Sequence, residues 1–200
     1  MAKRLNLTIR QGETFTRIVR WESPPIVYRA ITAITLAAPV QITAVGHGLK
    51  TGWRAAVVSV QGMKQINAEH EPPRESEYQQ VTVVDADNVS LNKVNSSEFD
   101  AYVSGGYLQF NTPVSLAGFS ARMSIKDRVG GTELLPITTG IDARIVLDDV
   151  NHTITITISA ADTALLTFTK GVYDLELVSG ALVVSTLYSG SVTVTKEVTT

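Results

Sequence analysis

Hydrophobic and polar residues take alternate positions along most of this chain. The clearest case is NHTITITISA, residues 151–160, in which three isoleucines and three threonines follow one another in turn. A period of two is the pattern of a β-strand that is covered on one face and exposed on the other. We therefore predict a strand here, with its isoleucines in a core. No segment shows a helical period with the same clarity.

The same alternation recurs in further segments that are bounded by Gly, Asn or Asp. They are residues 5–10, 15–22, 119–127, 143–149, 171–180, 182–190 and 191–198. Short strands at this spacing are typical of a β-sandwich. One short helical turn is predicted within SAADTALLTF, where Ser159 can cap the helix and Asp162 can return the hydrogen bond.

Residues 31–107 have a different pattern. Short apolar runs surround a glycine-rich corner, and two more runs flank Asp87-Asn88, which is a good turn pair. The polar segment NAEHEPPRESEY, residues 67–78, separates them and must leave the sheet, because its two prolines cannot donate to a strand ladder. This block is predicted to form a small β-barrel or folded sheet.

The two flanks of this block are predicted to belong together. A chain of 200 residues is long enough to bury a sizeable core. Residues 1–30 supply too few strands to bury a sheet face alone, whereas residues 108–200 would gain edge partners from them. We predict an all-β protein in which a β-sandwich, formed by residues 1–30 and 108–200, is interrupted by an inserted small β-barrel-like domain at residues 31–107.

Composition and charge narrow the classes of function. The chain has no cysteine, which excludes a disulfide framework, a thiolate zinc site and a cysteine nucleophile. Its formal net charge of −2 gives no overall basic field, so nucleic acid is not a predicted partner. The first residues lack the apolar segment of a secretory signal, and no apolar run is long enough to span a bilayer. We expect a protein made in a cytoplasm, with no membrane partner.

Charge is unevenly distributed along the chain. The first thirty residues carry six basic side chains and only two acidic ones. Such a bias is either a solvated strand face or a docking surface for an acidic neighbour. Both interpretations stay open at the level of sequence.

No pattern of catalytic or metal-binding residues stands out. His47 is predicted to bond the backbone across the corner, while Gly48 and Gly52 supply positive φ. The histidines at positions 47, 70 and 152 lack the spacing of a zinc motif. Acidic residues cluster in loops, where solvation explains them, although two acids on distant strands could still form the pair of a glycoside hydrolase. We expect no metal, no cofactor and no enzymatic activity.

Several motifs resemble those of virion proteins. The segment PVQITAVGHGLKTGWRAAVVSVQGMKQIN and the following VTVVDADNVSLNKV resemble a repeat seen in many phage tail and virion proteins. That repeat is often matched to the small β-domain that carries half of the catalytic cysteine region in ubiquitin-activating enzymes. Its recurring features are the corner from His47 to Gly52, Gly62-Met63 followed by Asn67, and Ser104 to Gly106. The resemblance implies no such activity, because this chain has no cysteine.

The flanking segments resemble Ig-like N-terminal domains of baseplate and receptor-binding assembly proteins. The resemblance is carried by Leu116 to Gly118, by Met123 and Ile125, and by the strand that starts at Gly171. Together the two resemblances cover nearly the whole chain. They imply an Ig-like β-sandwich with the inserted β-domain.

These resemblances imply a virion structural protein of a tailed bacteriophage, located in the virion tail and in the host cytoplasm during assembly. It would be a homo-oligomeric component of the tail, collar or baseplate and an adaptor for tail fibres or neighbouring ring proteins. The alternative is a host-receptor or carbohydrate-binding module of the tail, which would use Trp53 and loop tyrosines as exposed aromatic rings. Trp21 and Trp53 could instead pack the two modules together. We expect the partner interface to contain Arg4, Arg10, Arg17, Arg20, Trp21, Trp53, Glu71, Arg74, Glu75 and Tyr78.

Overall fold

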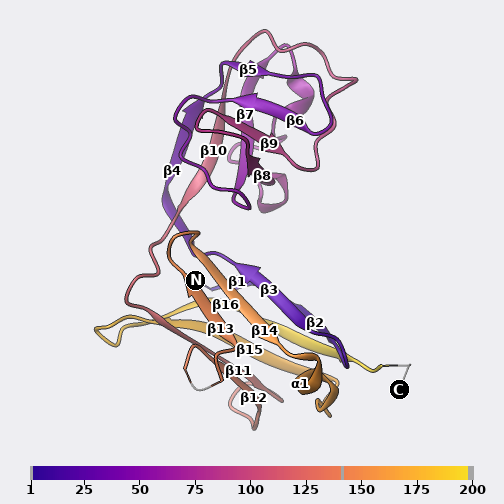
Figure 1. The fold of residues 1–200 in the computed structure, drawn as a ribbon, viewed down its shortest axis with the longest axis vertical. Helices are drawn as coiled ribbons and strands as arrows, with labels where there is room; N and C mark the ends of the chain where they lie inside the picture. The colour runs from indigo at the N-terminus through magenta and orange to yellow at the C-terminus, as the bar shows by residue number, and fades with distance from the viewer. Residues whose placement is uncertain (1, 141, 198–200) are drawn as a thin grey trace. The chain divides into compact units, whose positions relative to one another are not determined.

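The computed structural model describes residues 2–140 and 142–197. Their regular structure is almost entirely β-strand, with one short α-helix, α1 (Ala160–Ala164), in this described part, so the predicted all-β class is confirmed. The chain forms two compact units (Figure 1). Unit 1 contains Met1–Trp21 and Pro113–Thr200, and unit 2 contains Glu22–Thr112. Within the described residues, no helix has the length and apolar character needed to cross a membrane.

Unit 1 is a β-sandwich whose two sheets share one hydrophobic core. The larger sheet contains β1 (Lys3–Arg4), β2 (Leu7–Arg10), β11 (Ser120–Lys126), β12 (Glu133–Thr138), β15 (Lys170–Val178) and β16 (Val184–Thr195). The smaller sheet contains β3 (Phe15–Val19), β13 (Ile145–Asp148) and β14 (Thr153–Ile158). β1 and β2 both pair in parallel with β16, and β3 pairs with β14. The shared core includes Met123, Leu175 and Ile156.

The alternation in residues 151–160 forms the predicted strand with one buried face. The three isoleucines of β14 are at most 1% exposed, and the threonines between them are half-buried. The predicted helix cap also forms, because Ser159 Oγ accepts the backbone N–H of Asp162 at 3.1 Å. The Ser159 hydroxyl in turn donates to the Asp162 carboxylate at 2.8 Å. The returned hydrogen bond therefore runs between side chains.

One long strand replaces two predicted strands near the C-terminal end. β16 runs through Gly190, where the sequence analysis placed a boundary between residues 182–190 and 191–198. A Cβ at Gly190 would lie 2.2 Å from the backbone oxygen of Leu5. This glycine therefore makes room for the chain that passes from β1 to β2, and it does not end a strand. Position 198 lies outside the described residues.

Unit 2 is a single curled sheet. In pairing order its strands are β4 (Glu22–Ala30), β10 (Ser104–Pro113), β7 (Arg54–Gln61), β8 (Gln79–Val83), β9 (Asn88–Leu91), β6 (Val40–Thr43) and β5 (Ala33–Ile34). Two short 3-10 helices, η1 (Lys64–Ile66) and η2 (Glu75–Glu77), lie outside the sheet. The sheet covers a second core that includes Trp53, Met63 and Leu108. It curls without closing into a barrel, so of the two predicted forms, a small β-barrel or a folded sheet, unit 2 has the folded sheet.

The chain passes from unit 1 to unit 2 after Trp21 and returns after Thr112. The strand pattern of the sequence predicts these boundaries after residues 30 and 107. The difference arises because β4 and β10 pair with each other and so belong to unit 2. Within unit 1, the backbone N–H of Val114 donates to the carbonyl of Trp21 at 2.8 Å. This bond holds the departing chain and the returning chain side by side.

A chain in which Trp21 is joined to Val114 by a short Gly-Ser turn should fold without unit 2. The two residues are already hydrogen-bonded, so the turn bridges a small gap and unit 1 keeps all of its strands. We expect a β-sheet circular dichroism spectrum and one cooperative thermal transition. The matched control starts at Pro113, lacks β1, β2 and β3, and should show no cooperative transition. Equal melting temperatures for the two chains would contradict the place of these strands in the core.

Candidate functional site

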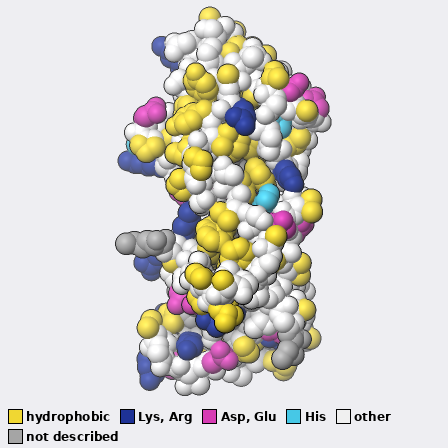
Figure 2. All heavy atoms as spheres, turned by 90° about the vertical axis from the view of Figure 1, so that its left-hand side faces the viewer, with side chains coloured by type: hydrophobic (Ala, Val, Ile, Leu, Met, Phe, Trp, Pro, Cys, Tyr) yellow, Lys and Arg dark blue, Asp and Glu magenta, His cyan; other side chains and the backbone are white. Residues whose placement is uncertain are grey.

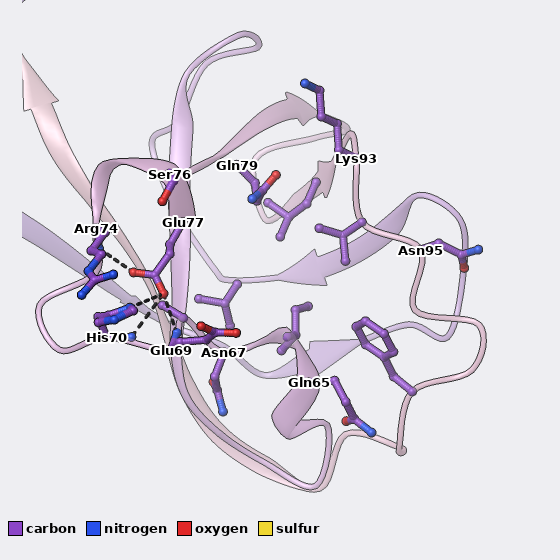
Figure 3. Close-up of a pocket in the computed structure, with 16 residues that line it drawn as sticks. Gln65, Asn67, Glu69, His70, Arg74, Ser76, Glu77, Gln79, Lys93 and Asn95 are labelled. Atoms are coloured by element: carbon purple, nitrogen blue, oxygen red, sulfur yellow. Dashed lines mark hydrogen bonds and ion pairs between the residues drawn. The ribbon is translucent and has the colours of Figure 1, made fainter. Parts of the chain in front are cut away.

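Unit 2 contains a cavity of about 590 Å³ beside the loop at residues 67–78 (Figure 3). Buried Val57 and Leu91 and the half-buried ring of Phe99 give it apolar walls. Ligand sites in proteins commonly combine apolar walls with a few polar groups. The polar side chains around this cavity are Gln65, Asn67, Glu69, His70, Arg74, Ser76, Glu77, Gln79, Lys93 and Asn95. This loop and its cavity are the candidate functional site.

The carboxylate of Glu77 organises the loop. Its Oε1 accepts the backbone N–H of Glu69 at 2.6 Å and of His70 at 3.2 Å, and the His70 ring Nδ1 also lies 3.2 Å away. Its Oε2 accepts the backbone N–H of Arg74. Figure 3 shows these bonds converging on one side chain. The bond from Arg74 above all, with those from His70 and Glu69, lowers the pKa of Glu77 to about 2. The ionised form is thus the one that holds the loop.

Asn67 fixes the start of the loop. Its side-chain oxygen accepts the backbone N–H of Val60 at 2.8 Å, and its amide nitrogen donates to the Val60 carbonyl at 3.0 Å. One side chain therefore pairs with β7 as the backbone of a neighbouring strand would. This contact is a physical reason for an asparagine at the position that the sequence analysis noted only as part of a recurring motif.

Arg54 ties the end of the loop to the sheet. Its guanidinium donates to Glu22 at 2.8 Å and to Glu75 at 2.6 Å, and it lies 5.5 Å above the ring of Tyr78. Burial opposes the charge on Arg54, but the hydrogen bonds to Glu22 and Glu75 raise its pKa above the ordinary value. The side chain of Glu22 is only 8% exposed. This ion pair is therefore screened less by salt than an exposed pair would be.

The described residues include one group that could hold a metal ion. Glu69, His70 and Glu77 offer ligand atoms within 4.8 Å of one another. The Oε1 atom of Glu77 already faces three nitrogen donors from the loop, and a cation would have to displace them. A metal site needs ligand atoms that are free to coordinate. The geometry therefore fits a carboxylate that anchors a loop better than it fits a metal centre.

His47 is a structural residue at the glycine corner, as predicted. It is 2% exposed, its Nδ1 accepts the backbone N–H of Leu49 at 2.9 Å, and its Nε2 lies 3.0 Å from the carbonyl of Asp85. Because Nδ1 accepts a hydrogen bond, it carries no proton. The ring proton is therefore on Nε2, which donates it to the Asp85 carbonyl, and the imidazole is neutral. Gly48 and Gly52 adopt φ of 70° and 87° beside it. Both ring nitrogens are thus engaged with the backbone.

Half of the predicted interface residues lie in unit 2. Glu71, Arg74 and Glu75 are exposed on the loop, and Tyr78 is half-buried at its end, under Arg54. Trp53 departs from the expectation, because it is 8% exposed and belongs to the core of unit 2. Its side chain is therefore not displayed to a partner.

The basic residues of the first thirty positions are not confined to one sheet. Arg4 on β1 and Arg10 on β2 lie in the larger sheet of unit 1, whereas Arg17 on β3 lies in the smaller one. Arg29 lies on β4 in unit 2. On the face drawn in Figure 2, basic and acidic side chains are scattered and interspersed with hydrophobic ones. Within unit 1, the division of Arg4, Arg10 and Arg17 between two sheets fits separate solvated positions better than a continuous basic surface.

Arg20 and Trp21 are half-buried at the point where the chain leaves unit 1. The carbonyl of Arg20 accepts the hydroxyl of Tyr188 at 2.9 Å. The ring of Trp21 meets that of Phe119 edge to face, with centroids 5.7 Å apart. The Trp21 ring therefore packs within unit 1, and the backbone of Arg20 is hydrogen-bonded there.

The residues that organise the loop were missed by the sequence analysis. Arg54 and Glu22 are 32 positions apart, and no local motif connects them. Glu77 had one local signal, because it is the third residue of η2, where a carboxylate can accept the backbone N–H that precedes the helix. From the sequence alone, solvation was a sufficient explanation for the acidic residues of this loop.

Comparisons with known proteins add no family assignment. No family model matches the chain, and no curated protein matches it significantly. The resemblance to phage virion proteins therefore stays a hypothesis that rests on the motifs in the sequence.

Replacing Glu77 with Gln should loosen the loop while the sheet of unit 2 stays folded. An amide is a weaker acceptor than a carboxylate, and its NH₂ group would face the N–H groups of the loop. We expect the backbone N–H groups of Glu69, His70 and Arg74 to exchange with deuterium about tenfold faster. The control is Glu71→Gln, which neutralises an exposed carboxylate of the same loop. Unchanged exchange in Glu77→Gln would refute the anchor.

The loop should also loosen in acid. Folding lowers the pKa of Glu77 from 4.5 to about 2, so its contribution to loop order is present above about pH 4.5 and is lost as the pH falls through about 2. Exchange protection of the same three N–H groups, corrected for intrinsic rates, should be constant from neutral pH to about pH 5 and fall below about pH 3. A loss of protection that is already complete above about pH 4.5 would contradict Glu77 as the controlling group.

Proposed function

We propose that this protein is a structural component of the virion of a tailed bacteriophage. Its place is the tail, collar or baseplate, and the host cytoplasm during assembly. It acts as an adaptor that holds tail fibres or neighbouring ring proteins, and it forms a homo-oligomer. The proposal involves no enzymatic activity and no cofactor.

The observation that carries this proposal is the preorganised loop on an inserted unit. Asn67, Glu77 and Arg54 fix the loop at its start, its middle and its end. Glu71 and Arg74 stay exposed on the same loop. A segment that is ordered before binding loses little conformational entropy when it docks. This arrangement supports recognition of a protein surface.

The mixed charge of the loop fits a polar protein partner. The exposed loop positions include Glu69 and Glu71 as well as Arg74. Complementary charges of both signs fix the orientation of two proteins more than they raise the affinity. An adaptor needs such orientation, because each copy must present its neighbour at a defined angle.

A carbohydrate-binding or receptor-binding role is the alternative. Sugar sites commonly use exposed rings that lie parallel in a groove. The two ring contacts in the described part of the chain, Trp21–Phe119 and Tyr28–Tyr107, have interplanar angles of 88° and 90°. Trp53, which the sequence analysis offered for stacking, is buried. These rings favour the adaptor.

The adaptor role predicts that particles are defective without this chain. Interrupting its reading frame in the encoding phage or prophage should give particles that lack fibres or carry incomplete tails in negative-stain electron microscopy. Supplying the intact gene in trans should restore them. Mass spectrometry of purified wild-type particles should detect the chain at a fixed ratio to the major tail protein.

Two other outcomes would redirect the proposal. Complete, infective particles that lack the chain would contradict a structural role in the virion. Complete particles that fail to adsorb to the host would favour receptor binding, and a glycan array probed with the purified chain would then identify the sugar.

A further inference from the structure

One end of the sheet of unit 2 is formed by β4, which pairs only with β10. Figure 1 shows β4 at the margin of this unit. β4 has nine residues, whereas the other described strands that end a sheet have two to six. Short strands, prolines and charged side chains are the usual protections of a sheet edge, because an edge is a template for another strand. After Pro25, residues 26–30 of β4 contain only one of these protections, Arg29.

Alternate residues of β4 direct their backbone groups away from β10. The N–H of Ile31 donates to the Gly106 carbonyl at 3.0 Å, and the Pro25 carbonyl accepts the hydroxyl of Thr112 at 3.3 Å. The two strands therefore run antiparallel, and residues 25 and 31 both face β10. Backbone groups along an antiparallel strand alternate in direction. The residues between them that direct N–H and C=O groups to the open edge are therefore Ile26, Tyr28 and Ala30.

The carbonyl of Tyr28 on this open edge has only a weak partner. It accepts the guanidinium of Arg29, its neighbour in the chain, at 3.4 Å. An N–H···O hydrogen bond is usually about 2.7–3.2 Å long. The exposed Arg29 forms no ion pair with another described residue. A backbone N–H from a docked strand can therefore replace Arg29 on the carbonyl and leave its charge for a carboxylate.

Apolar side chains lie beside the open edge on one face of the sheet. Ile26, Tyr28 and Tyr107 are 38%, 48% and 44% exposed. The two tyrosine rings meet edge to face, with centroids 6.1 Å apart. These side chains project from the face opposite the core, because Val27 and Leu108, their neighbours along the two strands, pack in or against the core. A docked strand would place every second side chain beside them.

We propose that the open edge of β4 binds an extended acidic segment of a partner protein, which adds a strand to the sheet of unit 2. Another extended backbone is the group that offers N–H and C=O groups at the spacing of this edge. Alternate apolar side chains of the segment contact Ile26 and Tyr28, and a carboxylate of the segment pairs with Arg29. The identity of the partner as a neighbouring virion protein, but not the contact, rests on the proposed function.

A second copy of this chain fits the open edge less well. Two copies of β4 that meet around Tyr28 would form a symmetric contact and bring Arg29 of each copy to the same short interface. Like charges across a strand pair are destabilising. Residues 26–30 contain no acidic side chain that could offset them. A carboxylate on a different protein removes this repulsion.

Deuterium exchange of the full-length protein with a synthetic peptide tests the contact. The probe is a peptide of about eight residues in which valine alternates with threonine and one central threonine is replaced by glutamate. It should slow the exchange of the N–H groups of Ile26, Tyr28 and Ala30 at least about fivefold. The N–H groups of Val27 and Arg29 already face β10 and should not change. Unchanged exchange along the edge at millimolar peptide would overturn the proposal.

A proline on the open edge tests whether the peptide binds as a strand. Ala30→Pro removes one edge N–H and is tolerated there, because that N–H does not bond to β10. It should weaken peptide binding about tenfold, whereas the matched control Ala30→Ser keeps the N–H and should bind like the wild type. If Ala30→Pro does not fold by circular dichroism, Ile26→Pro removes an N–H at the other end of the edge. Equal affinity of the proline variant and the control would overturn the added strand.

Reversing the charge at Arg29 tests the acidic character of the segment. Arg29→Glu should weaken binding of the glutamate peptide at least about threefold, because an attractive exposed pair becomes repulsive. A peptide with lysine in place of the glutamate should bind this variant better than it binds the wild type. If the lysine peptide shows no such preference, the segment is not selected by Arg29 and the acidic partner is overturned.

The remaining outcomes distinguish the occupant of the edge and separate this inference from the proposed function. Protection of the edge N–H groups that rises with protein concentration, without peptide, would identify a second copy and overturn the partner segment. A failed peptide contact would leave the virion role standing. An intact peptide contact, with complete particles formed in the absence of the chain, would overturn the virion role alone.

Discussion

The backbone hydrogen bond from Val114 to Trp21 determines how one chain can hold two units. Trp21 is the last residue before unit 2, and Val114 belongs to the segment that returns from it. The ring of Trp21 also packs edge to face against Phe119. Because the two connections leave side by side, the sandwich loses no strand pairing where it is interrupted. The first strands beyond the junction, β4 and β10, then pair with each other in unit 2. The chain therefore leaves unit 1 and re-enters it at one place, where the two connecting segments lie next to each other.

Carboxylate side chains hold several loops that lie outside the sheets. Glu77 accepts the N–H groups of the 67–78 loop, Asp85 accepts those of Asp87 and Asn88, and Asp149 accepts those of Leu116 and Ala117. These hydrogen bonds lower the pKa of Glu77 and Asp85. The hydroxyl of Ser115 above all, together with the N–H groups of Leu116 and Ala117, lowers the pKa of Asp149. Backbone N–H groups outside a ladder need an acceptor, and a short acidic side chain can take two at once. Glu77 and Asp85, two of the loop acids whose positions suggested only solvation, are therefore structural.

Alternating patterns made the strands of unit 1 predictable, because burial of one face imposes a period of two on every covered strand. The cap at Ser159 and the bonding of His47 were also predictable, since their partners lie within a few residues or across one tight corner. The candidate site was not, because Arg54 meets Glu22 only after the sheet has formed. The predicted strand boundary at Gly190 was wrong for the same reason. The backbone that leaves no room for a side chain at Gly190 belongs to Leu5, at the opposite end of the sequence.

The parallel pairing of β1 and β2 with β16 has a consequence for biosynthesis. β1 and β2 can pair only after β16 has been synthesised, and β16 ends at Thr195. Unit 2, in contrast, is complete once Thr112 has been synthesised. Unit 2 can therefore fold on the ribosome while the first strands of unit 1 still lack their partner. Closing a sheet between the two ends of a chain is slow, because nearly the whole sequence separates the contacts. During this interval β2 and β3 lack their partners β16 and β14, so their unpaired edges are open to wrong pairing.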